Sequence, residues 1–237
     1  MDIIGAMNKE REYLSFRVKG EEPFHLVDAV KEYGFDSLKA FFDAKRDYGL
    51  SQLRFEVVEK TPEDAIAGCF DLIENRKTAV LFVESDKTFV WNGNSGDYNA
   101  EYCAECGIPI YPIYASGGTI VSTPGDLSIG ICLPETIRAN STYILNKFAE
   151  IFRRYTHELV EVFGNDIIVG GVKVIGSSEY YRNDVFMWVA LISLSDKTEL
   201  IHEICRKHST KQPGYIDFMT AAQLREEVEK WLKIDSD

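Results

Sequence analysis

Apolar residues recur at helical spacing near the start of the chain. Two groups stand out, with Gly34 between them: Phe24, Val27, Val30 and Tyr33, then Leu38, Phe41 and Phe42. Side chains three and four positions apart share one face of a helix, so two short helices are expected here. Residues 1–56 are therefore predicted to form a helical N-terminal extension.

The next pattern is that of a strand followed by a helix. Residues 54–58 alternate between polar and apolar, which is typical of a strand. Thr61 then offers a capping hydroxyl, Pro62 suits the first helical position, and the acids Glu63 and Asp64 face the positive end of the helix dipole. A helix from this point to about Asn75 is predicted.

The middle of the chain contains several short apolar runs. Residues 78–83 and 88–91 are β-branched or apolar and flank a charged turn, which predicts a hairpin. A helix is expected over residues 98–106, followed by a strand at 108–113. The two prolines in that strand indicate an edge or irregular position, because proline cannot donate to a sheet.

From residue 127 onward the sequence predicts runs of strands with amphipathic helices between them. A strand is predicted at 127–133 and a long amphipathic helix at 142–163, which ends at Gly164. Three apolar strands at 167–169, 172–175 and 185–194 precede helices at 198–207 and 221–232.

This order predicts an α+β fold, because hairpin-like runs of strands are interrupted by groups of helices and no strict strand–helix alternation is present. The expected architecture is a mixed, mostly antiparallel sheet packed with helices on one side. Residues 57–237 are predicted to form this domain, after the extension at 1–56.

Charge and composition narrow the range of partners. The chain has 237 residues, 45% of them hydrophobic, and a net charge of -12 from 38 acidic and 26 basic residues. Such a chain can fill a large core, and its acidic surface repels nucleic acid and anionic lipid. The sequence shows neither a membrane-spanning run nor a secretory signal, so a cytoplasmic protein is expected.

The five cysteines do not form a disulfide pattern. They are odd in number and scattered, which predicts reduced thiols. Cys103 and Cys106 have the spacing of half a zinc site, but no second ligand pair of that kind exists in the sequence. We expect them on a short helix with Cys103 facing the core.

Two segments contain residues suited to binding a ligand. In the first, Gly117 and Gly118 precede a predicted turn at residues 123–126. Paired glycines serve either an ordinary turn or the close approach of a ligand, and the sequence leaves both readings open.

The second segment runs from Asn165 to Ser178. Gly170-Gly171 predicts a two-residue hairpin, and Lys173 follows it between two apolar valines. A lysine in an apolar strand either extends to solvent or pairs with a fixed anion. Gly176, Ser177 and Ser178 would leave space and hydroxyl groups beside it.

These two segments resemble the biotin and lipoate protein ligase superfamily, and most closely the catalytic domains of lipoate-protein ligases. In that family an Asn-Asp pair precedes a Gly-x-Lys hairpin, as Asn165-Asp166 precedes Lys173 here. The Gly-rich segment from Ser116 to Leu127 comes earlier in the chain, as in the lipoate ligases. The resemblance extends from about Glu59 to Leu232.

The resemblance implies an enzyme that activates a lipoyl or medium-chain acyl acid as an acyl-adenylate, for transfer to a lysine of an acceptor lipoyl-domain protein. Lys173 would be the catalytic residue, Asn165 and Asp166 would bind ATP, and Asp166 would also bind Mg²⁺. The residues implied at the acid are Ser116, Gly117, Gly118, Thr119, Gly176, Ser177 and Ser178.

The sequence departs from this pattern at one important place. Residues 112–115 stand where lipoate ligases usually carry an Arg-Arg pair. The charge could come from Arg138, Arg153, Arg154 or Arg182 instead. Two alternatives stay open: an ATP-independent octanoyl or lipoyl transferase with Cys132 or Cys205 as nucleophile, and a non-catalytic member that only binds a ligand.

Overall fold

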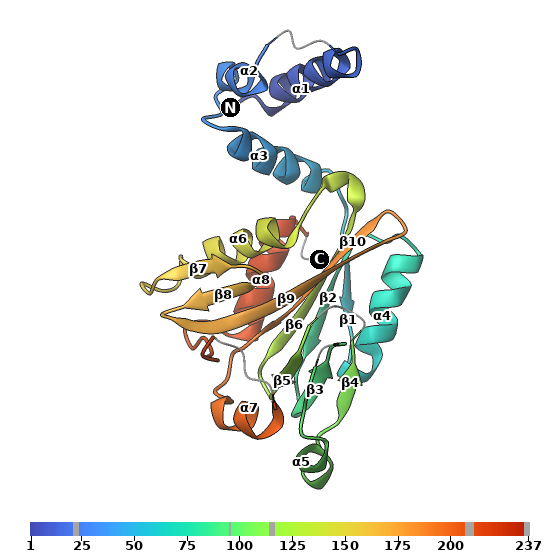
Figure 1. Cartoon of the computed structure of the whole chain (residues 1–237), viewed down its shortest axis with the longest axis vertical. Helices are drawn as coiled ribbons and strands as arrows, with labels where there is room; N and C mark the ends of the chain where they lie inside the picture. Colours follow the sequence, from blue (N-terminus) through green and yellow to red (C-terminus); the bar gives the residue numbers. More distant parts are fainter. Residues whose placement is uncertain (21–23, 95, 114–116, 207–210, 235–237) are drawn as a thin grey trace. The chain divides into compact units, whose positions relative to one another are not determined.

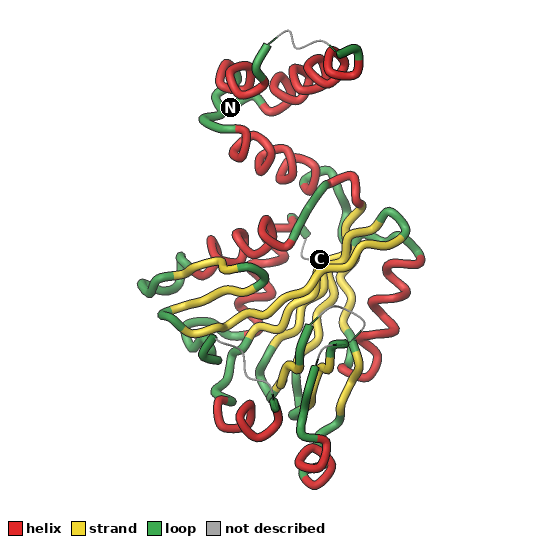
Figure 2. Tube along the Cα trace, in the orientation of Figure 1, coloured by secondary structure: helices red, strands yellow, loops and turns green. Residues whose placement is uncertain are grey.

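The computed structural model describes residues 1–20, 24–94, 96–113, 117–206 and 211–234. The chain divides into two compact units, Met1–Leu53 and Arg54–Asp237. Figures 1 and 2 show a helical first unit and a second unit built around strands. The assignment of residues 1–56 and 57–237 to separate functional domains stays a prediction.

The first unit contains the helices α1 (Ile3–Val18), α2 (Leu26–Glu32) and α3 (Leu38–Leu50). The sequence pattern predicted α2 and α3 but missed α1. Helix α1 has no single apolar face, because Ala6 and Glu10 are its buried residues while Ile4 and Leu14 are exposed. The carboxylate of Glu10 pairs with Lys45 of α3, so a tertiary ion pair helps to hold this helix.

Seven of the described strands form the main sheet of the second unit, in the order β1-β2-β6-β10-β9-β8-β7. Their bounds are β1 (Glu56–Glu59), β2 (Ala79–Glu84), β6 (Leu127–Pro134), β7 (Val160–Phe163), β8 (Asp166–Val169), β9 (Val172–Arg182) and β10 (Val185–Ile192). Strands β1 and β2 are parallel, and the other neighbours are antiparallel. The prediction of a mixed, mostly antiparallel sheet is confirmed.

A second, three-stranded sheet has the order β4-β3-β5. It consists of β3 (Phe89–Asn92), β4 (Ile110–Pro112) and β5 (Thr119–Ser122). The predicted hairpin of residues 78–83 and 88–91 is wrong, because β2 pairs with β1 and β6 while β3 pairs with β4 and β5. The apolar pattern located both strands but could not assign them to different sheets. Strand β4 lies at an edge, as its prolines indicated.

The helices of the second unit are α4 (Pro62–Glu74), α5 (Ala100–Glu105), α6 (Ser141–Phe152), α7 (Thr198–Ile204) and α8 (Ala221–Leu232), with the 3-10 turn η1 (Glu135–Ile137). Helix α4 begins as predicted, with the Thr61 hydroxyl accepting from the Asp64 amide at 3.3 Å. The predicted helix over 142–163 is wrong in its second half. It ends at Phe152, and residues Val160–Phe163 pair with β8 instead, because strand pairing outweighs the helical spacing of the apolar residues.

The main sheet is covered on both faces (Figure 1). On one face Trp188 of β10 packs against Phe148 of α6, with ring centroids 5.2 Å apart, and Phe148 contacts Trp231 of α8. On the other face α4 and the small sheet share a core with β2, β6 and β10. The expectation of helices on one side is therefore corrected, since α4 lies opposite α6 and α8.

A buried ion pair joins two distant segments of the second unit. Asp126, in the turn before β6, pairs with Lys197, which precedes α7, and their side chains are 0% and 4% exposed. The Asp126 carboxylate also accepts from the amides of Thr123 and Leu194, both at 2.8 Å. Burial lowers the pKa of Lys197, while the attraction of Asp126 opposes that shift.

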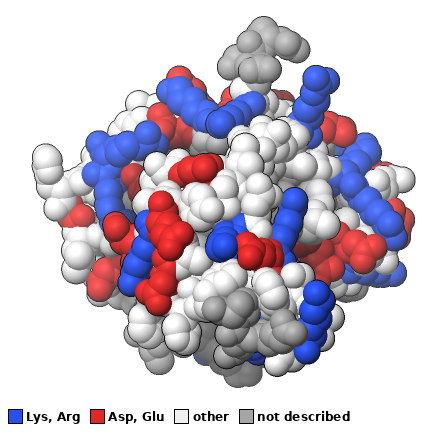
Figure 3. Space-filling model, turned by 90° about the horizontal axis from the view of Figure 1, so that it is seen from above, with Lys and Arg blue, Asp and Glu red and all other residues white. Residues whose placement is uncertain are grey.

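Charged side chains of both signs are interspersed on the face seen in Figure 3, so the acidic excess is not gathered into one patch there. Among the residues that the structure describes, no helix has both the length and the apolar character needed to cross a membrane.

Candidate functional site

A cavity of about 440 Å³ lies between the main sheet, helix α4 and the small sheet. This volume is in the range of small-molecule binding sites. The residues that form its walls include Ala65, Ile66, Cys69, Trp91, Gly117, Gly118, Thr119, Ile120, Ser128, Asp166, Lys173, Gly176, Ser177, Ser178, Tyr180 and Met187. The walls are mostly apolar, and the charged groups Asp166 and Lys173 belong to neighbouring strands.

Strand register explains which side chains face the cavity. Tyr180 is paired with Met187, and Gly176 with Leu191, in the antiparallel ladder of β9 and β10. Directly opposed residues share a face, and alternate residues of each strand do too. Gly176, Ser178 and Tyr180 therefore follow one another along the cavity, over a length of about 13 Å.

A β-bulge brings Lys173 onto this same face. Strand β8 pairs Ile167 with Ile175 but Ile168 with Lys173, so Val174 is the extra residue in β9. Without the bulge, strict alternation would direct Lys173 away from the face of Gly176. The bulge reverses that direction and places Lys173 beside Gly176 and Asp166.

Lys173 forms an ion pair with Asp166, whose Oδ1 lies 2.9 Å from the lysine Nζ. The second carboxylate oxygen of Asp166 pairs with Lys211. The side chain of Asp166 is 13% exposed and that of Lys173 is 32% exposed. The lysine is thus neither a fully buried charge nor a fully exposed one.

The serines after Gly176 have different surroundings. Ser177 donates its hydroxyl to the carbonyl of Asn165 at 2.8 Å and its amide to the same oxygen at 2.9 Å. These bonds fix the turn that contains Asn165, whose side chain is exposed. Ser178 is buried on the cavity face. The structure thus brings Lys173, Asp166, Gly176 and both serines together.

The Gly-rich segment forms another part of the wall. Gly117, Gly118 and Thr119 border the cavity, whereas Ser116 lies outside the described residues. A β-carbon at Gly117 or Gly118 would meet no described atom within 4 Å, and neither residue has a positive φ. Neither backbone strain nor packing against the described atoms therefore requires these glycines.

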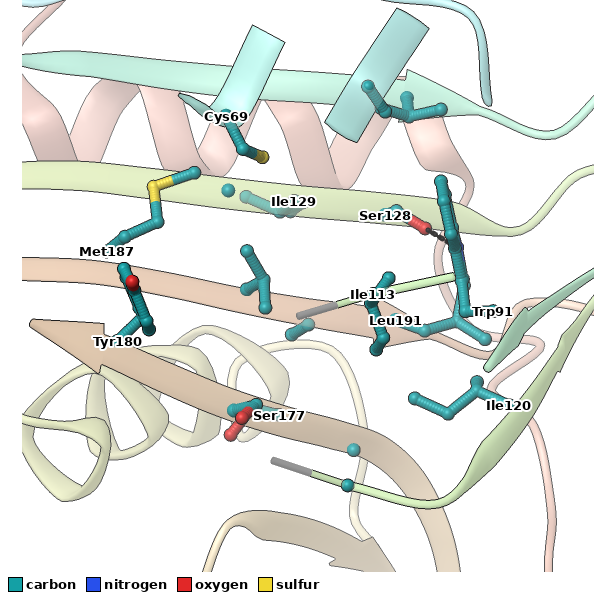
Figure 4. Close-up of a pocket in the computed structure, with 18 of the residues that line it drawn as sticks. Cys69, Trp91, Ile113, Ile120, Ser128, Ile129, Ser177, Tyr180, Met187 and Leu191 are labelled. Atoms are coloured by element: carbon teal, nitrogen blue, oxygen red, sulfur yellow. Dashed lines mark hydrogen bonds between the residues drawn. The ribbon is translucent and has the colours of Figure 1, made fainter. Parts of the chain in front are cut away.

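The end of the cavity far from Lys173 along β9 is lined by Tyr180, Met187 and Cys69, which lie near one another in Figure 4. Toward the small sheet, the Trp91 indole donates to the Ser128 hydroxyl at 3.3 Å (dashed line in Figure 4). The cavity therefore has an apolar end and a charged end, a shape that suits a molecule with an apolar tail and an anionic head.

Burial disfavours the thiolate form of three cysteines, of which Cys69 lines the cavity. Burial raises the pKa of Cys69 to about 12, with a smaller contribution from nearby Cys132. Burial also raises the pKa of Cys132 to about 12 and that of Cys205 to about 11. A cysteine nucleophile reacts as the thiolate, which these raised values disfavour.

The donor set around Asp166 does not fit a magnesium ion. Both carboxylate oxygens already pair with lysines, and two cations beside a single carboxylate repel a third. Within the described ranges, no group of three or more acidic, histidine or cysteine side chains could hold a metal. The predicted role of Asp166 as a metal ligand is not supported by this arrangement.

The arginines considered as replacements for the Arg pair lie elsewhere. Arg153 donates to the carbonyl of Val160 at 2.8 Å, and Arg154 pairs with Glu227 of α8. These two, Arg138 and Arg182 are not among the residues that line the cavity. Lys173 is the cation that the described part of the chain contributes to the cavity wall.

Sequence reasoning missed several residues of the site. Cys69 and Ile66 of α4, Ser128 of β6, and Tyr180 and Met187 at the apolar end received no role. Period-two alternation along β9 could have indicated Tyr180, since it follows Gly176 and Ser178 on one face. Which residues of α4 line the cavity depends on how the helix packs against the sheet, and no local sequence pattern predicts that packing.

No protein-family profile and no curated protein sequence matches the chain. Among solved structures, similarity is found to P. falciparum LipL1 in complex with lipoate, with a TM-score of 0.66 and 12% identity over 76% of this chain and 60% of that chain. The chain thus spans 60% of the length of LipL1.

Two further structures are similar over more of their length. A bi-partite lipoate protein ligase, studied with its E2 lipoyl domain from Thermoplasma acidophilum, has a TM-score of 0.61 and 15% identity over 78% of this chain and 86% of that chain. Lipoate-protein ligase A bound with ATP has a TM-score of 0.61 and 14% identity over 78% and 88%. At these identities the likeness establishes the fold alone, which is the fold seen in these lipoate-protein ligase structures.

Proposed function

We propose that this chain, which has the fold of the lipoate-protein ligases, binds a lipoyl-like or medium-chain carboxylic acid and activates it as an acyl-adenylate for transfer to a protein lysine. The observation that carries the proposal is the position of Lys173 at the charged end of an otherwise apolar cavity. The stretch of β9 from Gly176 to Tyr180 that lines the cavity spans about 13 Å, which suits an extended medium-chain acyl group.

Lys173 would act on the carboxylate. A fixed cation beside the reacting carboxyl stabilises the negative charge on its oxygens, and it contributes most when that charge increases in the transition state. Gly176 leaves room for the end of the lysine side chain, and Asp166 holds the ammonium in place until a ligand carboxylate binds.

Gly117, Gly118 and Thr119 would border the bound acid, and the apolar end at Met187 and Tyr180 would bury its tail. Burying an acyl tail stabilises the complex by about 0.8 kcal/mol for each methylene group. Apolar burial would therefore supply most of the affinity, and Lys173 would set the orientation.

ATP is the proposed source of the activating group. The similarity to an ATP-bound lipoate-protein ligase favours it. ATP would supply the adenylyl group and pyrophosphate as the leaving group. The nearby residues able to meet its phosphates are Lys173 and the exposed Asn165, and no step is assigned to a metal ion.

The transferase alternative receives less support from the structure. Cys132 and Cys205 are 0% and 7% exposed, their pKa values are raised, and neither lines the cavity. The ligase proposal needs no cysteine. Transfer to a lipoyl-domain acceptor, in a soluble cytoplasmic setting, belongs to the same proposal.

The direct test is a binding and turnover panel. Isothermal titration with lipoate, octanoate and biotin, without ATP, should show binding of lipoate or octanoate to the wild-type chain. Lys173→Met should weaken that binding by roughly tenfold or more, because it removes the paired cation while keeping the stem. The melting temperature of the Lys173→Met variant should stay close to that of wild type, which would show that its fold is intact.

Turnover is measured separately. Release of pyrophosphate with the bound acid and MgATP, followed by a mass increase on a lipoyl-domain acceptor, would support the ligase. Acid binding without pyrophosphate release would support the non-catalytic alternative. Binding of none of the three acids would contradict the proposed function as a whole.

A further inference from the structure

The segment from Lys211 to Ile216 lies along the strand that contains Lys173. The Lys173 amide donates to the carbonyl of Gln212 at 2.8 Å, and the Gly214 amide donates to the carbonyl of Lys173 at 3.0 Å. Both backbone groups of Lys173 are therefore held by this one segment. The approach is close, since a β-carbon at Gly214 would lie 2.3 Å from Val172 Cγ2.

This backbone pairing brings a second lysine to the site. Lys211 pairs with Asp166 Oδ2, while Lys173 pairs with Oδ1 of the same carboxylate. The Lys211 Nζ also donates to the carbonyl of Phe163 at 3.3 Å and lies 4.5 Å from the centre of its ring. Its side chain is 25% exposed. The ammonium is thus fixed on several sides beside Asp166, outside the cavity wall.

The charge balance gives Lys211 a specific effect. Two lysines and one carboxylate carry a net charge of +1, so the group attracts an anion. Without Lys211, Lys173 and Asp166 would form a neutral pair. An incoming carboxylate would then have to displace Asp166 from Lys173, the one cation left in the group. The displaced Asp166 carboxylate would be unpaired and would repel the carboxylate of the ligand.

We infer that Lys211 is a positioning residue of the proposed acid site: it neutralises and holds Asp166, so that Lys173 can turn from Asp166 to the carboxylate of the ligand. This inference rests on the proposed function. It replaces a magnesium-binding role for Asp166 with an ion-paired Lys-Asp-Lys group that can bind a carboxylate without a divalent metal.

The test compares octanoate with its neutral analogue octanamide, by isothermal titration in buffer with EDTA and without ATP. Lys211→Met should weaken octanoate binding by roughly tenfold and leave octanamide binding unchanged. Lys211→Arg, which restores the charge, should bind octanoate within about threefold of wild type. Lys230→Met is the matched control, because Lys230 is an exposed lysine paired with Glu226 at 2.8 Å and does not line the cavity.

Each outcome has a distinct meaning. Equal octanoate affinity in Lys211→Met and wild type would overturn the inference, and so would an equal loss of octanoate and octanamide, which would show a purely structural role. If Lys211→Met does not fold, Lys211→Gln is measured instead, since it keeps a hydrogen-bond donor without the charge. Failure of wild type to bind octanoate, lipoate or biotin would contradict the proposed function itself.

Discussion

The side chain of Lys173 lies directly over Gly176. A β-carbon at Gly176 would approach Lys173 Cε to 3.0 Å and Nζ to 3.1 Å. The atoms it would meet belong to the flexible end of the lysine, so the fold can adapt while the ammonium cannot keep its place. Gly176 therefore determines the position of the cation more than the stability of the strand.

Gly176→Ala is expected to displace Lys173 and to weaken octanoate binding by about three- to tenfold, since small misplacements of a binding group reduce its contribution sharply. The melting temperature should change little. Titration calorimetry and thermal melting on the same samples provide the check. A variant with wild-type affinity would show that the ammonium does not depend on this gap.

Gly118→Ala is expected to behave differently from an ordinary loop substitution. The added β-carbon meets no described atom, so stability should be equal or higher by about 0.4–1 kcal/mol through loss of unfolded-state freedom. Ligand affinity should fall, because the methyl group occupies space along the cavity wall. Unchanged affinity in calorimetry would mean that the acid does not approach this segment.

Asp126→Asn should destabilise the second unit. It removes the charge that pairs with Lys197 and leaves a buried ammonium, a loss of about 3–5 kcal/mol. The double variant Asp126→Asn/Lys197→Met should recover part of that loss. Urea unfolding followed by tryptophan fluorescence reports on this unit, since Trp91, Trp188 and Trp231 all belong to it. A single-variant loss below about 1 kcal/mol would count against the ion pair.

Glu63 connects α4 to the small sheet in a pH-dependent way. Hydrogen bonds from Lys87 and from Tyr111, the latter at 2.6 Å, lower the pKa of Glu63 from 4.5 to about 2. A folded-state pKa below the unfolded value stabilises the fold above about pH 4.5, and that contribution is lost as the pH falls toward 2.

The melting temperature of Glu63→Gln should therefore lie below that of wild type at pH 7, and the gap should narrow as the pH falls below 4.5 and close only near pH 2. The effect should be modest and should decrease with added salt, because the ion pair is exposed. Melting curves at pH 7, 5 and 3 provide the measurement. A gap that is constant over this range would exclude a contribution from ionised Glu63.

Native thiol reactivity tests the transferase alternative. Cys106 is exposed, whereas Cys103, Cys132 and Cys205 are buried and Cys69 is half-buried with a pKa of about 12. Brief treatment with iodoacetamide at pH 7.5 should therefore add one label, at Cys106, and denatured protein should add five. Fast labelling of Cys132 or Cys205, located by peptide mass, would support a cysteine nucleophile.

The sequence by itself determined the class of the fold and the most distinctive residue of the site. Period-two and helical patterns located most strands and helices of the second unit, and Gly170-Gly171 formed the predicted hairpin, with φ values of +56° and +87°. The lysine between apolar valines indicated either a side chain extending to solvent or a cation held by a fixed anion, and the structure shows the pair with Asp166. These features depend on residues that are close in sequence, so local sequence patterns predict them.

Tertiary structure decided the rest. Strands β2 and β3 are close in sequence but belong to different sheets, and residues 160–163 became a strand because β8 pairs with them. The direction of Lys173 depends on the bulge at Val174, a single extra residue that strict alternation does not reveal. Lys211 reaches Asp166 from 45 positions away. Such contacts join residues distant in sequence, so only the packed chain brings them together.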